Sequence, residues 1–226
     1  MKHRPDTVKI LCVADEVDLL VYSPRIRERF GDVDLVLSAG DLPDEYLGYI
    51  TSMLNRPIVS VAGNHDAEPG LSAAARVSNF NALEIHDSRA MTGRIAFKVK
   101  KESGLRILGI PGSMRYNSGP NQFSQFSMSW RIALMLPGLL VRRLFTGRGV
   151  DIILAHSPPC GIHDGPDLPH RGFSSFRWLI RAAAPAYFVH GHVHLYDLQT
   201  ARETQMGSTT VINVYGHKVI ETGGRS

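Results

Sequence analysis

Short apolar runs that stop abruptly at polar residues are the feature that most constrains the fold of this 226-residue chain. The runs are residues 10–14, 33–39, 59–62, 152–155 and 186–189. Each is followed by a side chain that can bind a metal ion: Asp15, Asp41, Asn64, His156 and the pair His192 and His194. Runs of this kind are typical of buried strands, and open α/β sheets bind their ligands at the carboxyl ends of strands. The sequence therefore predicts that these side chains meet at one edge of a parallel sheet.

The order of the predicted elements indicates an α/β fold. Strands are expected at residues 8–14, 33–38, 58–61, 150–155 and 186–189. Helices are expected between them at residues 24–30, 43–53, 71–77 and 173–184. Two adjacent strands at 95–99 and 105–110 predict an antiparallel part of a sheet, and residues 209–214 and 218–221 are expected to close the fold as a hairpin.

The candidate ligands offer carboxylate, amide and imidazole groups and no thiolate. Three imidazoles favour a transition metal such as manganese, iron, zinc, nickel or cobalt over calcium or magnesium alone. Six ligands are more than one ion with open positions takes, so we expect two divalent transition-metal ions about 3.5–4 Å apart, bridged by a carboxylate. Such a pair lowers the pKa of a bound water and supports in-line displacement at phosphorus.

The polar motifs together resemble the calcineurin-like metallophosphoesterase superfamily in both type and order. They are Asp15, Gly40-Asp41, Gly63-Asn64-His65-Asp66, His156 and Gly191-His192-Val193-His194. The resemblance implies an α/β fold in which two mixed β-sheets pack as a four-layer sandwich flanked by helices. It also implies a metal-dependent phosphoesterase that hydrolyses phosphomonoesters or phosphodiesters by means of a metal-bound hydroxide.

The resemblance assigns a role to each motif residue. Asp41 would bridge the two metals. Asp15 and His194 would bind one ion, and the amide and the two remaining imidazoles would bind the other. His65 would lie beside the metals and contact the phosphate or protonate the leaving group, and Asp66 would orient His65.

One position departs from the family pattern. The first block of the family is Asp-x-His, whereas this chain has Asp15-Glu16-Val17-Asp18, a variant that resembles a subset of bacterial members. Valine cannot coordinate a metal, so Glu16, Asp18 or water are the alternatives for the missing ligand. We expect the first metal site to be weaker or more selective than the second.

Several polar residues outside the ligand set are weaker candidates. Arg115 and Asn117 lie in a loop after a predicted strand and are candidates for substrate binding, because arginine offers a planar fork to phosphate. His163 and His170 lie in the loop after His156, which either closes over the site or is simply solvated. His190 is expected to support the ligands or to be a buried donor.

Positive charge is concentrated in the middle of the chain, where residues 76–148 hold twelve basic and three acidic side chains. This is either a solvated face or a surface that attracts an anionic substrate or surface. Within it, residues 123–148 are an apolar and basic helical insertion that Pro137-Gly138 should break into two helical pieces. The segment is too short and too charged to span a bilayer. Core packing, a homodimer contact and a membrane-surface contact are the alternatives.

The chain length fits one large domain or two at most, and the resemblance implies a single metallophosphoesterase domain over residues 1–226. The start of the sequence has no signal-peptide core, which predicts a cytoplasmic location. The two cysteines, Cys12 and Cys160, give no indication of an oxidising compartment. The phosphate-ester substrate is the one partner that the motifs imply. Two rival functions remain, a non-catalytic metal-binding scaffold on the same fold and a nuclease. A nucleic acid partner is not favoured, because the chain has no evident aromatic and basic groove.

Overall fold

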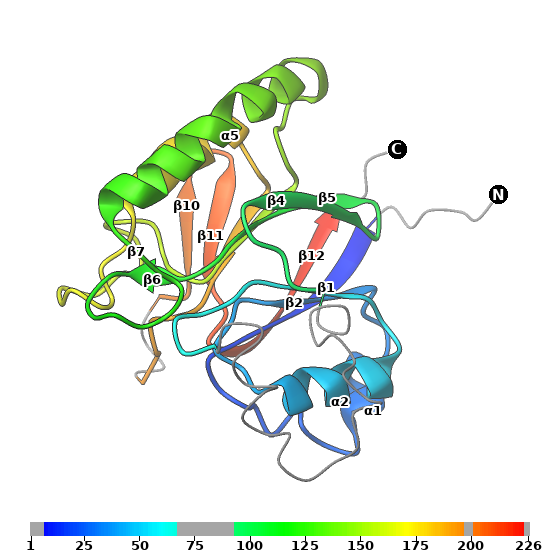
Figure 1. The fold of residues 1–226 in the computed structure, drawn as a ribbon. Coiled ribbons are helices and arrows are strands. Elements are labelled where there is room, and N and C mark those ends of the chain that lie inside the picture. Colours follow the sequence, from blue (N-terminus) through cyan, green and yellow to red (C-terminus); the bar gives the residue numbers. More distant parts are fainter. Residues whose placement is uncertain (1–6, 67–92, 197–200, 224–226) are drawn as a thin grey trace, which may run out of the picture.

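Two β-sheets lie face to face in the structure, a computed structural model that describes residues 7–66, 93–196 and 201–223. Sheet I has the strand order β12-β1-β2-β3, and sheet II has the order β10-β11-β9-β8-β5-β4. Figure 1 shows sheet I in blue and red beside sheet II in green and orange. Both sheets are mixed: sheet I has one antiparallel edge strand, β12, beside parallel strands, and sheet II has an antiparallel strand at each edge of its parallel centre.

The strands of sheet I are β1 (Thr7–Ala14), β2 (Leu35–Ser38), β3 (Ile58–Ser60) and β12 (Gly216–Gly223). The strands of sheet II are β4 (Lys98–Glu102), β5 (Leu105–Ile110), β8 (Ile152–Ala155), β9 (Tyr187–His190), β10 (Glu203–Met206) and β11 (Thr209–Asn213). A small parallel pair joins β6 (Ser113–Met114) to β7 (Gln122–Phe123).

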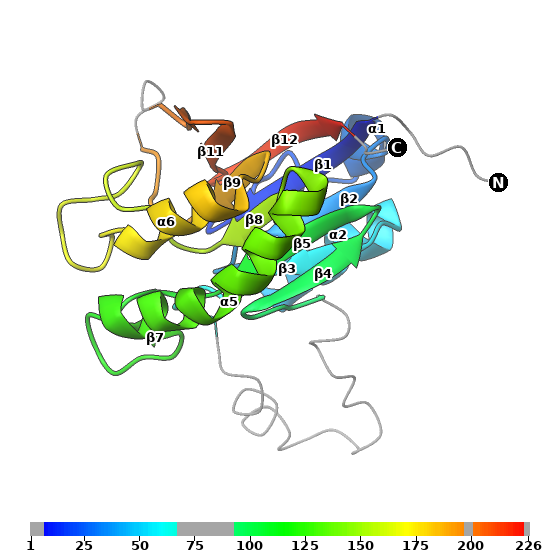
Figure 2. The ribbon, with the colours of Figure 1, turned by 90° about the horizontal axis from the view of Figure 1, so that it is seen from above.

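Helices cover the outer face of each sheet and complete four layers. The helices are α1 (Ile26–Phe30), α2 (Asp44–Leu54), α5 (Gln125–Thr146) and α6 (Ser174–Ala183). The first two pack with sheet I, whereas α5 and α6 lie side by side over sheet II (Figure 2). This arrangement confirms the four-layer α/β sandwich expected from the sequence. The helix expected at 71–77 lies outside the described residues.

Both faces of the central strands are buried, which explains why they appear in the sequence as continuous apolar runs. In β1, Ile10 and Cys12 face the core between the sheets, whereas Leu11 and Val13 face the helical layer over sheet I. The edge strand β4 differs, because its exposed lysines discourage pairing with another chain.

The expected closing hairpin is wrong. The strand β11 pairs with β10 and β9 in sheet II, whereas β12 crosses to sheet I and pairs with β1 along its whole length. The chain changes sheets at Gly216, whose positive φ of 70° suits glycine. A prediction from neighbouring segments alone could not find the partner of β12, because the pairing joins Thr7 to Gly223.

The expected break at Pro137-Gly138 is also wrong, because α5 is one helix with Pro137 inside it. Ser124 caps its amino end by accepting a hydrogen bond from the Ser127 amide, and Gly147 ends it in a left-handed conformation. Pro137 lies on the exposed side, where the carbonyl that loses its helical partner can turn to solvent. No helix within the described parts of the chain is long and apolar enough to cross a membrane.

Candidate metal centre

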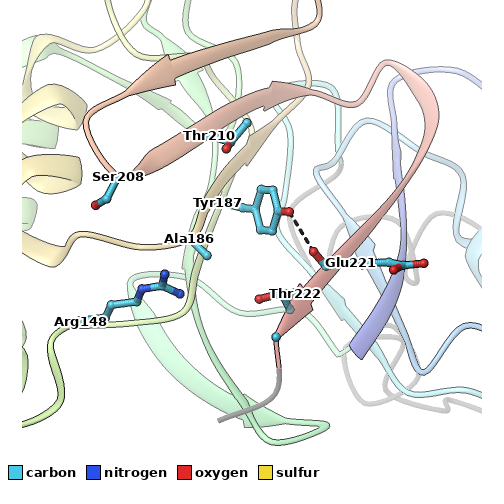
Figure 3. A pocket seen from close by; sticks show the side chains of 8 residues that line it. Arg148, Ala186, Tyr187, Ser208, Thr210, Glu221 and Thr222 are labelled. Carbon is cyan, nitrogen blue, oxygen red and sulfur yellow. Dashed lines mark hydrogen bonds between the residues drawn. The ribbon is translucent and has the colours of Figure 1, made fainter. Parts of the chain in front are cut away.

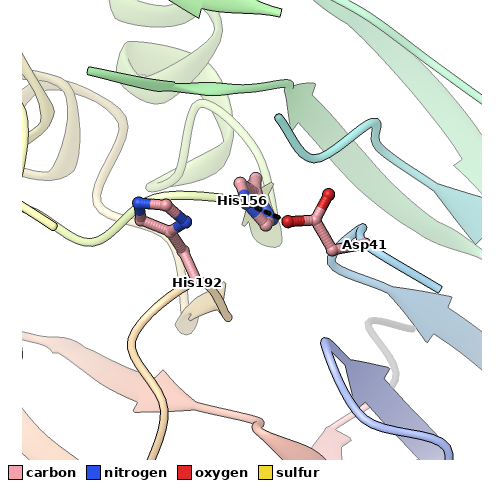
Figure 4. A group of neighbouring side chains, drawn as sticks. All are labelled: Asp41, His156 and His192. Carbon is pink, nitrogen blue, oxygen red and sulfur yellow. Dashed lines mark ion pairs between the residues drawn. The ribbon is translucent and has the colours of Figure 1, made fainter. Parts of the chain in front are cut away.

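Three of the expected ligands form a compact cluster between the two sheets. Asp41 follows β2, His156 follows β8 and His192 follows β9, so sheet I supplies the carboxylate and sheet II both imidazoles. Their ligand atoms all lie within 4.8 Å of one another. Figure 4 shows the three side chains converging from separate strand ends. The parallel strands thus bring together residues that are far apart in the sequence, as expected from their positions at carboxyl ends.

The backbone at three expected ligands adopts a conformation that most side chains avoid. Asp15, Asp41 and His192 have positive φ values of 63°, 55° and 68°. Such left-handed residues turn the chain sharply at a strand end, and they persist where surrounding contacts hold them. One such contact joins the sheets, because the His192 amide donates a hydrogen bond of 2.8 Å to Asp15 Oδ2.

Glycine directly precedes the expected ligands Asn64 and His192 because no side chain fits there. A Cβ atom on Gly63 would lie 2.0 Å from Asp41 Oδ1, and one on Gly191 would lie 2.4 Å from Asp15 Oδ2. The Gly-Asn and Gly-His motifs therefore have a steric cause: the backbone of one loop passes directly against the carboxylate of another.

The imidazole of His156 faces two oxygen atoms. A cation placed among these three groups would bind all of them. Its Nδ1 donates to the Ala39 carbonyl oxygen at 2.7 Å, so Nε2 points at Asn64 Oδ1 at 3.0 Å and Asp41 Oδ2 at 3.3 Å. Burial alone would lower the pKa of His156, but the Asp41 carboxylate raises it to about 9. Without a metal, a proton on Nε2 holds these oxygens together, and a divalent ion suits the same donors.

Contacts behind the ligands set the atoms that they present to a metal. The Asn64 amide donates from Nδ2 to the Tyr116 hydroxyl at 3.2 Å, which turns Oδ1 toward His156. The His192 ring donates from Nε2 to the Pro169 carbonyl at 2.8 Å, which leaves Nδ1 as the lone-pair atom. Burial lowers the pKa of His192 to about 3, so this ring is neutral, as a metal ligand must be.

Asp15 and His194, the ligands expected for the first metal, are not among the three side chains of this cluster, although Asp15 accepts a hydrogen bond from the His192 amide. Asp15 Oδ1 is buried and has no hydrogen-bond partner, and burial raises the pKa of this carboxyl to about 6. An orphaned buried acceptor of this kind suits a cation. His194 is exposed, and its Nδ1 lies 2.8 Å from the Tyr196 hydroxyl, while its ring centroid lies 4.8 Å from that of Tyr215.

The residues at and beside position 17, where the family has a metal-binding histidine, contact other parts of the protein. Val17 packs against the apolar core between sheet I and its helices. Asp18 Oδ2 lies 2.5 Å from Nδ1 of His217, and the Glu16 carboxylate is hydrogen-bonded to the Tyr215 side chain. Both acidic neighbours thus contact other side chains, and Glu16, Asp18 and water remain the alternatives for the missing ligand.

The Asp66 carboxylate holds two ligand loops together. Its Oδ2 accepts hydrogen bonds from the Gly63 amide at 2.8 Å and the Asp41 amide at 3.2 Å, and Arg94 lies 3.8 Å away. These described contacts position the metal loops, whereas the role expected from the resemblance was to orient the His65 ring. His65 itself is exposed, and its amide donates to Asp41 Oδ1 at 2.8 Å, which places its side chain beside the cluster.

The two expected substrate-binding residues make contacts within their own loop. Arg115 donates to the Gln122 carbonyl at 3.4 Å, and Asn117 Oδ1 accepts from the Gly119 amide at 2.7 Å and from the Gln122 side chain at 2.5 Å. Asn117 thus shapes the turn. The residue between them, Tyr116, is the one that reaches a ligand, and sequence reasoning missed it although it lies in the same loop.

The loop at residues 157–172 packs on the histidines of sheet II rather than extending into solvent. Besides the Pro169 contact, the ring centroid of His170 lies 5.2 Å from that of His192. His163 Nδ1 lies 3.1 Å from Nε2 of the buried His190, whose own Nδ1 donates to the Gly191 carbonyl at 2.9 Å. His190 therefore accepts from His163, and burial lowers its pKa to about 3.

A pocket of about 380 Å³ lies at the opposite end of the strands from these ligands. Its lining includes Arg148, Thr210 and Tyr187, whose hydroxyl donates to the Glu221 carbonyl at 2.8 Å (Figure 3). Tyr187 begins β9, whereas His190 ends it beside the metal loops. This hollow is therefore separate from the cluster where the titratable and metal-binding groups gather.

Comparisons with known proteins show the family and the fold that this chain resembles. The family model described as calcineurin-like phosphoesterase matches residues 5–196. Among solved structures, TT1561 of Thermus thermophilus is similar with a TM-score of 0.57 and 13% identity, covering 97% of this chain and 100% of that one. Vps29 from Entamoeba histolytica, in complex with zinc, has a TM-score of 0.42 and 13% identity, covering 92% of this chain and 74% of that one.

A comparison with curated proteins finds no match. The family match covers most of the chain, including every expected metal ligand, and the four-layer fold has the arrangement that the family resemblance implies. The chain belongs to the calcineurin-like phosphoesterase family.

Proposed function

We propose that this protein is a metal-dependent phosphoesterase that hydrolyses phosphomonoesters or phosphodiesters. The observation that carries the proposal is the cluster of Asp41, His156 and His192, in which a buried imidazole nitrogen faces the oxygens of Asp41 and Asn64. Burying these polar groups is costly unless they are paired or bind a cation. A metal centre at the strand ends accounts for that cost.

The family resemblance divides the donors between two divalent ions. Asn64, His156 and His192 would hold one ion, Asp15 and His194 would hold the other, and Asp41 would contact both. Divalent ions bound there would lower the pKa of a water molecule and neutralise charge on the phosphate. Manganese, iron, zinc and nickel are the candidates that the imidazole-rich set favours.

His65 is the proposed acid. Its ring is exposed, while its amide is fixed on Asp41 Oδ1, so the side chain lies beside the cluster and remains accessible to a substrate. From there it would bind a phosphate oxygen or donate a proton to the leaving-group oxygen. Asp66 supports this arrangement by holding the backbone of the Asp41 and Asn64 loops.

The test is hydrolysis of chromogenic phosphomonoesters and phosphodiesters by protein that has been stripped of metal and then titrated with manganese, iron, nickel, zinc or magnesium. We expect metal-dependent turnover that is lost in His65→Ala, while this variant still takes up metal. The control is Arg148→Ala, which removes a side chain at the opposite end of the strands from the ligand cluster.

Two results would replace the proposal. Full metal uptake with no hydrolysis of any ester would favour a non-catalytic metal-binding scaffold. Activity confined to nucleic acid substrates and falling steeply with salt would favour a nuclease, because phosphate-backbone binding releases counterions.

A further inference from the structure

Helix α5 has an outward apolar face that packs on nothing within the described parts of the chain. Its inner side is fixed in the core over sheet II by Met128, Ile132 and Leu139, which are buried. Its outer side carries large apolar side chains with high exposed fractions: Phe126 79%, Trp130 60%, Leu134 66%, Val141 55%, Leu144 84% and Phe145 84%. The exposed apolar side chains are therefore not the ones that anchor α5 to the core.

These side chains form one continuous stripe. The residues 126, 130, 134, 137, 141 and 144 recur at intervals of three or four, which on a helix of about 3.6 residues per turn places them on one side. Pro137 lies on this exposed side, so the helix stays continuous along the stripe. On the neighbouring helix α6, Trp178 is 53% exposed and adds a second exposed tryptophan to this layer. We call these residues the α5 face.

Helices α5 and α6 are rich in arginine and contain no acidic residue. Together α5 and α6 carry five arginines and no aspartate or glutamate: Arg131, Arg142, Arg143, Arg177 and Arg181. Arg131 is held over the rings of Phe97 and Phe123, at 4.8 Å and 5.4 Å from their centroids. Arg143 donates to the Arg181 carbonyl at 2.5 Å, which fixes it where α5 and α6 meet.

We propose that the α5 face docks on an anionic membrane surface. Tryptophan and phenylalanine suit the boundary between headgroups and acyl chains, and flanking arginines suit anionic headgroups. A second copy of this chain is the less favourable occupant. A two-fold contact through this face would bring two sets of arginines together with no acidic residue of α5 or α6 to pair with them.

The chain contains its own probe for this proposal, because its only two tryptophans are Trp130 and Trp178. The full-length protein is mixed with vesicles of phosphatidylcholine containing one third phosphatidylglycerol, or of phosphatidylcholine alone. We expect the tryptophan emission to shift to the blue and the protein to sediment with the anionic vesicles. Both effects are expected to weaken with neutral vesicles and with added salt.

A matched pair of double variants distinguishes binding through the α5 face from non-specific hydrophobic binding by other exposed side chains. Leu144→Ser with Phe145→Ser removes two adjacent exposed side chains of the α5 face and keeps both tryptophans. Leu19→Ser with Leu20→Ser removes two adjacent exposed leucines, of 78% and 49% exposure, from the loop before α1. We expect the first pair to weaken vesicle binding by about tenfold or more and the second to leave it unchanged. Because all four positions are exposed, folding is expected to survive in both.

Three results would overturn the proposal. The first is an unchanged emission and no sedimentation with anionic vesicles. The second is equal loss of binding in the two double variants. The third is a dimer in light scattering that the α5 variant converts to a monomer without any vesicle binding, which would assign the face to a second copy of the chain.

Discussion

Replacing Asp66 with alanine is expected to destabilise the fold and weaken metal binding together. The Asp66 carboxylate is the acceptor for the backbone amides of Gly63 and Asp41 and lies near Arg94, whose side chain is 17% exposed. Its removal leaves two amides and a half-buried guanidinium without this partner. Burial raises the pKa of Asp66, although the two amides and Arg94 act in the opposite direction. Removing the carboxylate therefore also removes the cost of burying its charge, which offsets part of the stability lost with the hydrogen bonds.

The magnitude follows from these contacts. A hydrogen bond to a charged group contributes about 1.5–3 kcal/mol, and removing one partner of a buried ion pair costs about 3–5 kcal/mol. After the offset from the buried carboxylate, we expect a loss of about 2–4 kcal/mol in the free energy of unfolding. Metal affinity is expected to fall by about 10–100-fold, because the loops that present Asp41 and Asn64 lose their common support.

Urea unfolding of metal-free protein and competition with a chelating dye measure the two effects. Asp44→Ala is the matched control, because Asp44 lies 3.9 Å from the same arginine but its side chain is 57% exposed. A surface pair of this kind contributes about 0–1 kcal/mol. The reasoning would be refuted if Asp66→Ala cost no more stability than Asp44→Ala, or if it left metal affinity unchanged.

Three further predictions concern the metal ligands. Titration of stripped protein with manganese is expected to give one tighter and one weaker equivalent, because Val17 supplies no imidazole; two equally tight sites in calorimetry would contradict this. Apparent metal affinity is expected to rise about tenfold from pH 7 to pH 8 and to level off above pH 9. The reason is that the metal must displace the proton from His156, whose pKa is about 9. A metal affinity that does not change with pH in dye competition would exclude this linkage. Gly63→Ala is expected to abolish tight metal binding, because the new Cβ would lie 2.0 Å from Asp41 Oδ1. Gly48→Ala in α2 is the control: its Cβ would have no atom within 4 Å, so the free energy of unfolding in urea is expected to rise by about 0.5–1 kcal/mol. Equal behaviour of the two variants would refute the steric argument.

The central parallel strands and the cluster of Asp41, His156 and His192 could be predicted from the sequence because their causes are local, whereas β6, β7 and β10 were not expected and the strand expected at 95–99 lies at Lys98–Glu102. Strands buried on both faces appear as continuous apolar runs, and a ligand directly after such a run lies at a carboxyl end. Asp41, His156 and His192 meet as this argument requires. The fold class followed from the alternation of these runs with helical segments.

Features that depend on distant backbone atoms could not be predicted in this way. The carbonyls of Ala39 and Pro169, which select the ligand atoms of His156 and His192, are not encoded by any side chain. Tyr116 reaches Asn64 only because the loop folds back between β6 and β7. The continuity of α5 likewise depends on which side of the helix Pro137 occupies, which local breaking rules do not consider.

The pairing of β1 with β12 has a consequence for how the chain is made. Until residues 216–223 have emerged from the ribosome, β1 is an edge strand whose amides and carbonyls on that side have no partner. Its side chains are nearly all buried in the final fold, so a nascent or truncated chain presents an apolar, unprotected edge. Sheet I is therefore completed only after nearly all of the described chain has been synthesised, and loss of the last strand is expected to produce aggregation rather than a smaller folded protein.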